Sequence, residues 1–188
     1  MVLYPRWSKT NYEIKIDPYE IEGLTISIPQ VQKAPWGVIR TLSATLKEGY
    51  TFVKWDFNPK TDIDSLTTLN ATFTMPQYNI VITPVVEKIT YTITYDPGRY
   101  GNGSTWEQIK EYGKDATLKG AAEIGFTRIG YTQIGWSTTN SGIAGSNYEA
   151  DGTGVYSDNA DTTLYPVWKK NEYIIDYNNG GYGTAPTS

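Results

Sequence analysis

The sequence predicts a mainly β protein, α+β at most, that is built from small modules in tandem. The first observation is a stretch that occurs three times. Residues 164–177 read LYPVWKKNEYIIDY, residues 3–16 read LYPRWSKTNYEIKI, and residues 82–95 carry a divergent copy, ITPVVEKITYTITY. Self-similarity at a nearly fixed period indicates an array of like units. We interpret each copy as the last strand of one module, a short connector and the first strand of the next.

The composition is the second observation, and it favours strands. The chain has 16 Tyr and 6 Trp but only 4 Phe, and aromatic residues are enriched in strands. Its 18 Gly and 10 Pro cluster between the candidate strands, as turns require. The third observation is an alternation of apolar and polar residues, because a period of two is typical of a half-buried strand.

The first module begins with such an alternation, in which Tyr12, Ile14 and Ile16 share one face. The strands predicted after it lie at residues 24–28, 42–46, 50–55, 72–75 and 80–86. The polar stretch 58–68 is predicted to be a loop.

The second module begins at residues 91–95, and its later strands are predicted at 106–112, 130–136 and 163–168. Residues 117–124 are the one place where a short helix is expected, although Gly120 disfavours it. The stretch 137–161 is rich in Gly, Ser, Asn and Asp. We expect it to be a mobile loop and a contact surface, because insertions in repeat modules fall in loops on one face.

A second internal match predicts the core. Residues 49–55 read GYTFVKW and residues 130–136 read GYTQIGW, so Phe52 is replaced by Gln133 and that face tolerates a polar group. Side chains two apart in a strand share a face, so positions 53 and 55, and 134 and 136, are expected to point inward. The predicted core residues are Trp55, Trp136, Val53, Ile134, Trp168 and Ile93.

The order of these motifs resembles the Listeria–Bacteroides repeat, also called the internalin-type B-repeat. In the second module the resemblance rests on residues 91–98, 113–115, 130–136 and 164–168. The first module resembles the divergent branch of the family, through residues 42–46, 49–55, 73–76 and 79–84. The chain departs from the family pattern at Gln133, where an aromatic residue is usual, at Val86, where Trp is usual, and in the long 137–161 stretch.

The resemblance implies small β-grasp-like modules of about four strands with little helix. It also implies an extracellular location, on the bacterial cell surface or in a secreted protein. The predicted function is a non-catalytic tandem repeat segment that acts as a spacer or stalk, with adhesion as a further role. The alternative is a module that binds a glycan or a host protein through exposed Tyr residues or the 137–161 stretch. The expected partners are therefore further repeats of the same chain and a host protein or glycan.

The predicted organisation is the end of a preceding repeat (1–10), a divergent module (11–88), a second module (89–170) and the start of a further repeat (171–188). The apolar rows in residues 3–7 and 173–177 have no core of their own within the two modules. Unpaired strands of this kind seek a partner edge. We therefore expect the ends to be frayed in isolation and to belong to further modules in the intact protein.

Composition argues against several other classes of function. A net charge of −4 argues against a nucleic-acid partner, and no apolar run is long enough to insert in a membrane. The chain has no His and no Cys, and no cofactor is predicted. We predict that it is not an enzyme, because its carboxylates fall in loops or on outward positions. These carboxylates are Asp62, Asp64, Glu107, Glu111, Asp151 and Asp158.

Two kinds of binding site remain open. Asp151, Asp158 and Asp161, with Asn159, offer the oxygen ligands that calcium prefers. Their spacing matches no known calcium loop, and an Asx-rich turn explains the same residues. Separately, the aromatic rings of Tyr4, Tyr50, Tyr131 and Tyr165 could form a platform for a sugar or a protein. Cross-strand pairing within a sheet is the favoured explanation of these rings.

A Lys–Asn crosslink in the core is a further alternative in a chain without cysteine. Its candidate lysines are Lys15, Lys54 and Lys119. Alternation places each of them facing solvent instead.

Overall fold

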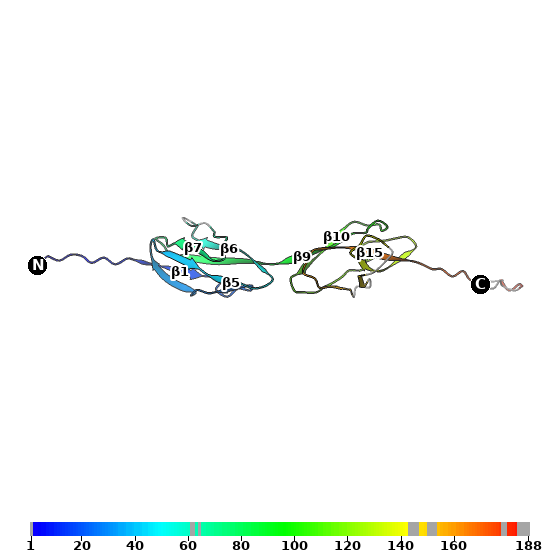
Figure 1. Ribbon diagram of the computed structural model, residues 1–188, viewed down its shortest axis with the longest axis horizontal. Helices are drawn as coiled ribbons and strands as arrows, with labels where there is room; N and C mark the ends of the chain where they lie inside the picture. The colour runs from blue at the N-terminus through cyan, green and yellow to red at the C-terminus, as the bar shows by residue number, and fades with distance from the viewer. Residues whose placement is uncertain are drawn as a thin grey trace. The chain divides into compact units, whose positions relative to one another are not determined.

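The computed structural model describes residues 2–60, 63, 65–142, 147–149, 154–177 and 180–183 of the 188-residue chain. The chain divides into two compact units (Figure 1). Unit 1 comprises residues 1–90 with 111–113, and unit 2 comprises residues 91–110 with 114–188. No helix occurs among the described residues, so the prediction of a mainly β protein is confirmed.

The described residues of unit 1 form eight strands. They are β1 (Asn11–Ile16), β2 (Leu24–Ile26), β3 (Val31–Pro35), β4 (Ile39–Leu42), β5 (Ala44–Leu46), β6 (Tyr50–Asn58), β7 (Ala71–Thr74) and β8 (Ile80–Lys88). The main sheet has the order β3-β1-β8-β6, and two small sheets pair β2 with β5 and β4 with β7. The core between these sheets contains Trp55, Phe57 and Phe73, which are at most 7% exposed.

Unit 2 repeats this plan with a larger main sheet. Its strands are β9 (Thr90–Tyr95), β10 (Trp106–Glu111), β11 (Ala116–Thr117), β12 (Tyr131–Ser137), β13 (Tyr148–Glu149), β14 (Val155–Tyr156) and β15 (Thr162–Lys170). The main sheet has the order β10-β9-β15-β12-β13, and β11 pairs with β14. Ile93, Tyr95 and Trp136 are fully buried at its centre, and Trp168 is 6% exposed.

The first and last strands of each unit lie side by side in parallel. Ile14 of β1 pairs with Ile80 of β8 in unit 1, and Ile93 of β9 pairs with Thr162 of β15 in unit 2. An Asx side chain fixes the start of each pair. Asn79 Oδ1 accepts a hydrogen bond from the Glu13 amide at 2.7 Å, and Asp161 Oδ1 accepts one from the Thr92 amide at 2.8 Å.

The indole rings of Trp55 and Trp136 occupy matching places in the two units. Both side chains are fully buried. The Trp55 Nε1 donates to the Leu69 carbonyl at 3.0 Å, and the Trp136 Nε1 donates to the Lys119 carbonyl at 2.9 Å. Each indole N–H is thereby paired with a backbone acceptor, as a buried donor requires.

A β-bulge beside each of these Trp residues corrects the predicted core. The pairing of β6 with β8 shifts between Phe52 and Lys54, and that of β12 with β15 shifts between Gln133 and Gly135. The extra residue of a bulge is unpaired and breaks the alternation of the strand. Ile134 is 47% exposed, so the prediction that it points into the core is wrong. Val53, at the matching position, is only half-buried.

Two predictions about unit 2 are also wrong. Residues 121–125 form a hydrogen-bonded turn, in which the Phe126 amide donates to the Ala121 carbonyl at 2.7 Å, and not a helix. The stretch 137–161 is not simply a loop, because it contributes β13 and β14. Tyr156 of β14 is 3% exposed in the core. Residues 143–146 and 150–153 of this stretch lie outside the described residues.

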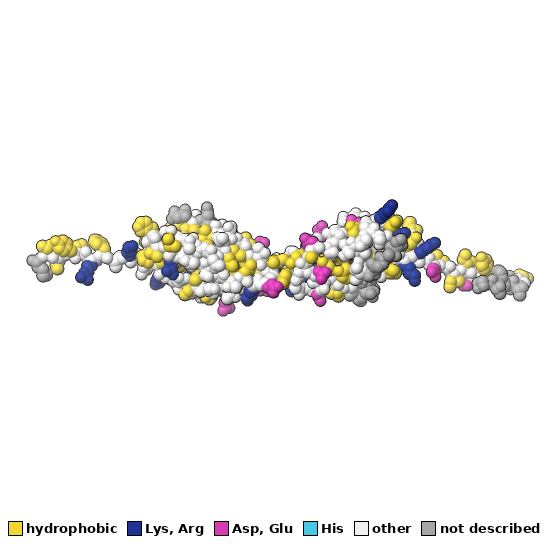
Figure 2. Space-filling view, viewed as in Figure 1, with side chains coloured by type: hydrophobic (Ala, Val, Ile, Leu, Met, Phe, Trp, Pro, Cys, Tyr) yellow, Lys and Arg dark blue, Asp and Glu magenta, His cyan; other side chains and the backbone are white. Residues whose placement is uncertain are grey.

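The described residues at the two ends of the chain form no strand. Leu3, Tyr4 and Trp7 are 80%, 83% and 90% exposed, and Ile174 is 91% exposed. Figure 2 shows hydrophobic side chains at the surface near both ends of the chain. Among the described residues there is also no helix with the length and hydropathy that crossing a bilayer requires.

Candidate binding surface

Tyr50 and Tyr131 open the matching strands β6 and β12. Each follows a glycine with a positive φ, +83° at Gly49 and +76° at Gly130. The Tyr50 ring lies directly over Gly23, where a Cβ atom would collide with it. Tyr50 is half-buried, so only part of its ring surface is available to a ligand.

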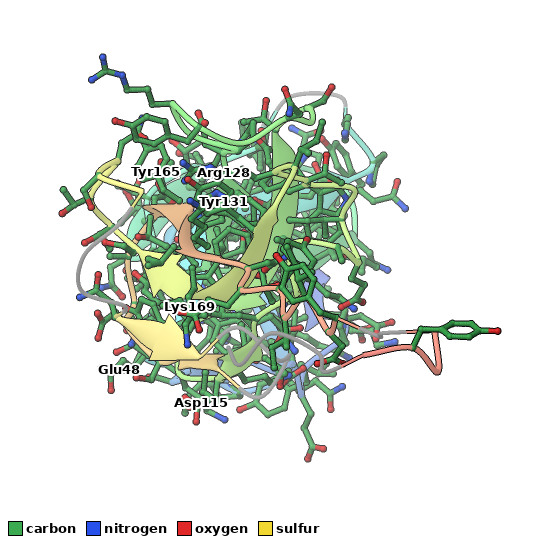
Figure 3. The ribbon with its side chains drawn as sticks, turned by 90° about the vertical axis from the view of Figure 1, so that its right-hand side faces the viewer. Glu48, Asp115, Arg128, Tyr131, Tyr165 and Lys169 are labelled. Atoms are coloured by element: carbon green, nitrogen blue, oxygen red, sulfur yellow. The ribbon has the colours of Figure 1, made fainter. Side chains whose placement is uncertain are left out.

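Tyr131 is half-buried beneath a cation. The guanidinium carbon of Arg128 lies 3.6 Å from the centre of the Tyr131 ring and 4.9 Å from that of Tyr100. Figure 3 shows Arg128 and Tyr131 close together in unit 2. No described carboxylate forms an ion pair with Arg128. The guanidinium is therefore held by aromatic faces, an arrangement that attracts a cation through the ring quadrupole.

Tyr165 lies on the central strand β15 beside a turn. A Cβ atom at Gly98 would lie 3.4 Å from its ring, and Asn140 Oδ1 accepts a hydrogen bond from the Arg99 amide at 3.0 Å in the same region. Tyr165 is half-buried. Of the three predicted tyrosines, Tyr50 belongs to unit 1, and Tyr131 and Tyr165 belong to unit 2.

A hollow of about 450 Å³ opens beside Tyr131. Its lining includes Ala121, Phe126, Arg128 and Trp168. The Trp168 Nε1 is buried without an acceptor, and so is the Nη1 of Arg128. Buried donors in proteins are normally paired, so these two N–H groups are exceptions, and neither has the accessible surface that contact with a ligand in the hollow requires.

The residue that opens the hollow is Gln133. It faces Trp168 across the sheet, whereas the corresponding pair in unit 1 is Phe52 with Val86. The Gln133 side chain accepts a hydrogen bond from the Ala121 amide at 2.7 Å and donates one to the Gly135 carbonyl at 3.1 Å. The replacement of an aromatic residue by Gln was visible in the sequence. Its consequence, a polar hollow beside Arg128, was not.

Part of the chain is similar to a known protein family. Residues 23–90 match the family described as the divergent InlB B-repeat domain. The match covers all of unit 1 from β2 to the end of β8 and confirms the resemblance seen in the sequence. No curated protein matches the chain.

The B-repeat family indicates a surface repeat module, of a kind that is typically non-catalytic. In unit 1, Lys15 pairs with Asp17 at 2.8 Å and Lys54 pairs with Asp56 at 3.3 Å. In unit 2, Lys119 pairs with Glu123. All three candidates for a crosslink therefore lie beside a carboxylate, and within the described part of the chain none of them is hydrogen-bonded to an Asn side chain.

The calcium candidates are only partly described, since Asp151 lies outside the described residues. Asp161 is engaged with the Thr92 amide. The charge of Asp158 adds to burial in raising the pKa of both Tyr148 and Tyr156. Within the described ranges no group of three acidic side chains is placed to hold a metal ion.

The other candidate carboxylates do not converge either. Glu107 is exposed, and Glu111 forms an ion pair with Lys88 at 3.5 Å. Asp62 and Asp64 lie outside the described residues.

One buried charge was missed from the sequence. Lys110 of β10 is 2% exposed, and its Nζ donates to Asn159 Oδ1 at 3.1 Å. Its neighbour Ile109 is 63% exposed, so β10 presents its apolar residue to solvent and its charged residue to the protein. The Lys110 Nζ also lies 5.7 Å from the centre of the Tyr91 ring. Alternation alone predicts the two faces of a strand but not which of them is covered.

Proposed function

We propose that this chain is a non-catalytic tandem repeat segment of a bacterial cell-surface or secreted protein and that it acts as a mechanical spacer. The match of residues 23–90 to the divergent InlB B-repeat domain supports a surface repeat module, and the internal repeat supports an array. The alternative is a module that binds a glycan or a host protein.

The observation that carries the spacer proposal is the parallel pairing of terminal strands. In each unit the chain enters through one strand and leaves through its parallel neighbour, β1 with β8 and β9 with β15. The start of the first strand and the end of the last strand then lie at opposite ends of the pair. A stretching force applied there slides the two strands past each other and loads their hydrogen bonds together.

In both units, further hydrogen bonds extend the parallel pair of terminal strands. The Asp17 amide donates to the Ile82 carbonyl and the Asp96 amide donates to the Leu164 carbonyl, both at 3.0 Å. Together with the Asn79 and Asp161 contacts, these bonds extend each pair at both ends. A single residue, Ile89, separates β8 from β9, so the connector adds little slack to the chain.

The test is single-molecule stretching of the full chain. We expect two unfolding events, each releasing up to roughly 260–290 Å, since an extended residue spans about 3.3–3.6 Å. The chain has no cysteine, so pairs of Cys substitutions can define where the force is applied.

Two ways of attaching the handles distinguish resistance to sliding of the terminal strands from the overall stability of unit 1. Handles at Thr10→Cys and Glu87→Cys load β1 against β8 in sliding. Handles at Thr51→Cys and Glu87→Cys pull apart two residues that pair directly across β6 and β8, so hydrogen bonds break one at a time. All three positions are exposed. The first geometry should require several-fold more force, and equal forces in the two geometries would refute the spacer mechanism.

A further inference from the structure

Each of the two repeats carries an aromatic residue in an equivalent turn. Trp36 follows β3 and Tyr112 follows β10, and a glycine with a positive φ comes next, +79° at Gly37 and +67° at Gly113. β3 and β10 each lie at the edge of a main sheet, beside the first strand of their repeat, β1 or β9. Trp36 and Tyr112 therefore hold equivalent positions in successive repeats.

Tyr112 covers Gly49 within unit 1. Residues 111–113 belong to this compact unit, although in sequence they follow β10 of the second repeat. A Cβ atom on Gly49 would lie 2.8 Å from an atom of the Tyr112 ring, so a glycine is needed beneath the ring. The Ile89 amide donates to the Gly49 carbonyl at 2.8 Å, and the Ile89 carbonyl accepts from the Tyr112 amide at 2.9 Å. Gly49 is buried under this contact.

Gly130 in unit 2 has the same backbone setting and is open. It begins the same GYT sequence as Gly49, with a φ of +76°, and its carbonyl accepts from the Asn171 amide at 2.9 Å. A Cβ atom on Gly130 would meet no described atom within 4 Å, and the residue is half-buried. Ile129 beside it is 94% exposed. An apolar surface is thus open at the position that Tyr112 covers in unit 1.

Trp36 is the aromatic residue of the equivalent turn in unit 1, and it is exposed. Its exposed fraction is 58%, and it lines a hollow of about 650 Å³ together with Lys9, Thr10 and Val38. Thr10 holds the place in the repeated stretch that Ile89 holds between β8 and β9. The hollow therefore lies beside the connector, as the contact of Tyr112 with Ile89 does.

We propose that this aromatic-on-glycine contact joins successive repeats of the array at both ends of this chain. Trp36 docks on the GYT glycine of a repeat placed before unit 1, and Gly130 receives the turn aromatic of a repeat placed after unit 2. The inference rests on the proposed function, because it names the surfaces through which the spacer segment extends. Exposed apolar residues that gather in one place mark interaction sites.

The partner is a repeat of the same kind, because the two open surfaces complement each other. One offers an uncovered glycine, and the other offers an aromatic ring on the turn that covers this glycine in unit 1. Ile129 stands where unit 1 has Glu48, which accepts a hydrogen bond from the Tyr112 hydroxyl. An indole has no hydroxyl, so an apolar neighbour suits Trp36. Gly130 and Trp36 can therefore be tested against each other.

The experiment joins two copies of the chain, so that Lys170 of the first runs directly into Thr10 of the second. Lys170 and Lys9 hold the same place in the repeated stretch, so the spacing of the repeats is kept. The ¹⁵N indole signal of Trp36 is assigned through Trp36→Phe in the single chain. In the joined chain, Trp36 of the first copy should keep this signal. Trp36 of the second copy should give a shifted signal of equal intensity that a soluble gadolinium chelate broadens less.

Variants of the joined chain test both surfaces. Ile129→Ser in the first copy should return the shifted signal toward the free position. Ile109→Ser changes another exposed isoleucine of unit 2 and should leave the signal in place. Docking should also stabilise unit 2 of the first copy. Trp36→Ala in the second copy should therefore lower the urea midpoint of that unit, whereas Trp36→Ala in the first copy should not.

The single chain offers a measurement that needs no joined copies. Tyr112→Ala uncovers Gly49, so it should accelerate hydrogen exchange of the Ile89 amide at least about fivefold. Tyr112→Phe keeps the ring and should accelerate it less. The Asn171 amide, whose acceptor Gly130 is already open, should exchange at the same rate in both variants and in the parent.

Several outcomes would overturn the proposal. In the joined chain, a single Trp36 signal of double intensity at the free position would refute docking. Equal urea shifts from Trp36→Ala in the two copies would do the same, and so would a shifted signal that survives Ile129→Ser. Unchanged exchange of the Ile89 amide in Tyr112→Ala would show that the ring does not protect the glycine. The force measurements load strands within one unit, so the spacer mechanism and the docking contact fail independently.

Discussion

Replacing Trp136 by Ala should destabilise unit 2 more than almost any other single change. The indole is fully buried, with ring centres of Tyr95 and Phe126 at 4.9 and 6.2 Å. Its Nε1 is also the donor to the Lys119 carbonyl at 2.9 Å. The substitution therefore removes aromatic packing, leaves a cavity and deprives a buried carbonyl of its donor.

The magnitude follows from these losses. Removing a large buried aromatic side chain costs about 3–5 kcal/mol of unfolding free energy. At about 0.05–0.15 kcal/mol per residue, a unit of this size has about 4–12 kcal/mol in total. The Ala variant should thus lose a large fraction of its stability. Trp136→Phe keeps most of the ring and loses the N–H, so it should cost about 1–3 kcal/mol.

Urea unfolding followed by circular dichroism and fluorescence measures these costs. Because two units can unfold separately, each transition must be fitted by itself. Trp55→Ala is the matched control, since it should shift the transition of unit 1 and leave that of unit 2 in place. If Trp136→Ala unfolds within about 1 kcal/mol of the parent, the packing argument is wrong.

The remaining predictions concern the terminal strands, alkaline pH and the bulge. Asp161→Ala leaves the Thr92 amide without its acceptor and should cost about 1 kcal/mol in urea unfolding, whereas Asp161→Asn keeps an acceptor and should cost less. A cost as large for Asn as for Ala would show that the hydrogen bond is not responsible. Burial raises the pKa of Tyr95 above its ordinary value of 10.0. Below pH 10 the group is protonated in both states, so its contribution to stability is intact there. As the pH rises further, only the unfolded chain ionises at first, so that contribution is lost progressively toward the raised pKa. The urea midpoint of unit 2 should therefore fall between pH 9 and pH 11, and less steeply in Tyr95→Phe; identical slopes would contradict this. Ile134→Thr should change stability by no more than about 0.5 kcal/mol, because the side chain is 47% exposed on the bulge. A cost above about 1.5 kcal/mol in the same assay would restore Ile134 to the core.

The sequence alone was enough to predict the features that depend on the spacing of residues along the chain. Matching motifs at residues 49–55 and 130–136 predicted that Trp55 and Trp136 are core residues, because equivalent residues of similar modules occupy equivalent positions. Alternation located the first strands β1 and β9, where Ile14 and Ile93 are at most 2% exposed. These features are local, or are copied from one module to the next.

The tertiary structure decided what depends on a partner far along the chain. A β-bulge adds one extra residue to one strand of a pair, and it depends on how that strand pairs with its neighbour. The exposure of Ile134 could therefore not be predicted from the alternation of apolar and polar residues. Lys110 is buried and Ile109 exposed because of what covers β10, which the strand's own residues do not specify. The hollow beside Tyr131 needed both kinds of information. The sequence shows that Gln133 replaces an aromatic residue. Only the pairing of β12 with β15 places it opposite Trp168, and only the fold brings Arg128 to the same hollow. Strand pairing joins residues that are far apart in the sequence, so it depends on the packing of the whole unit.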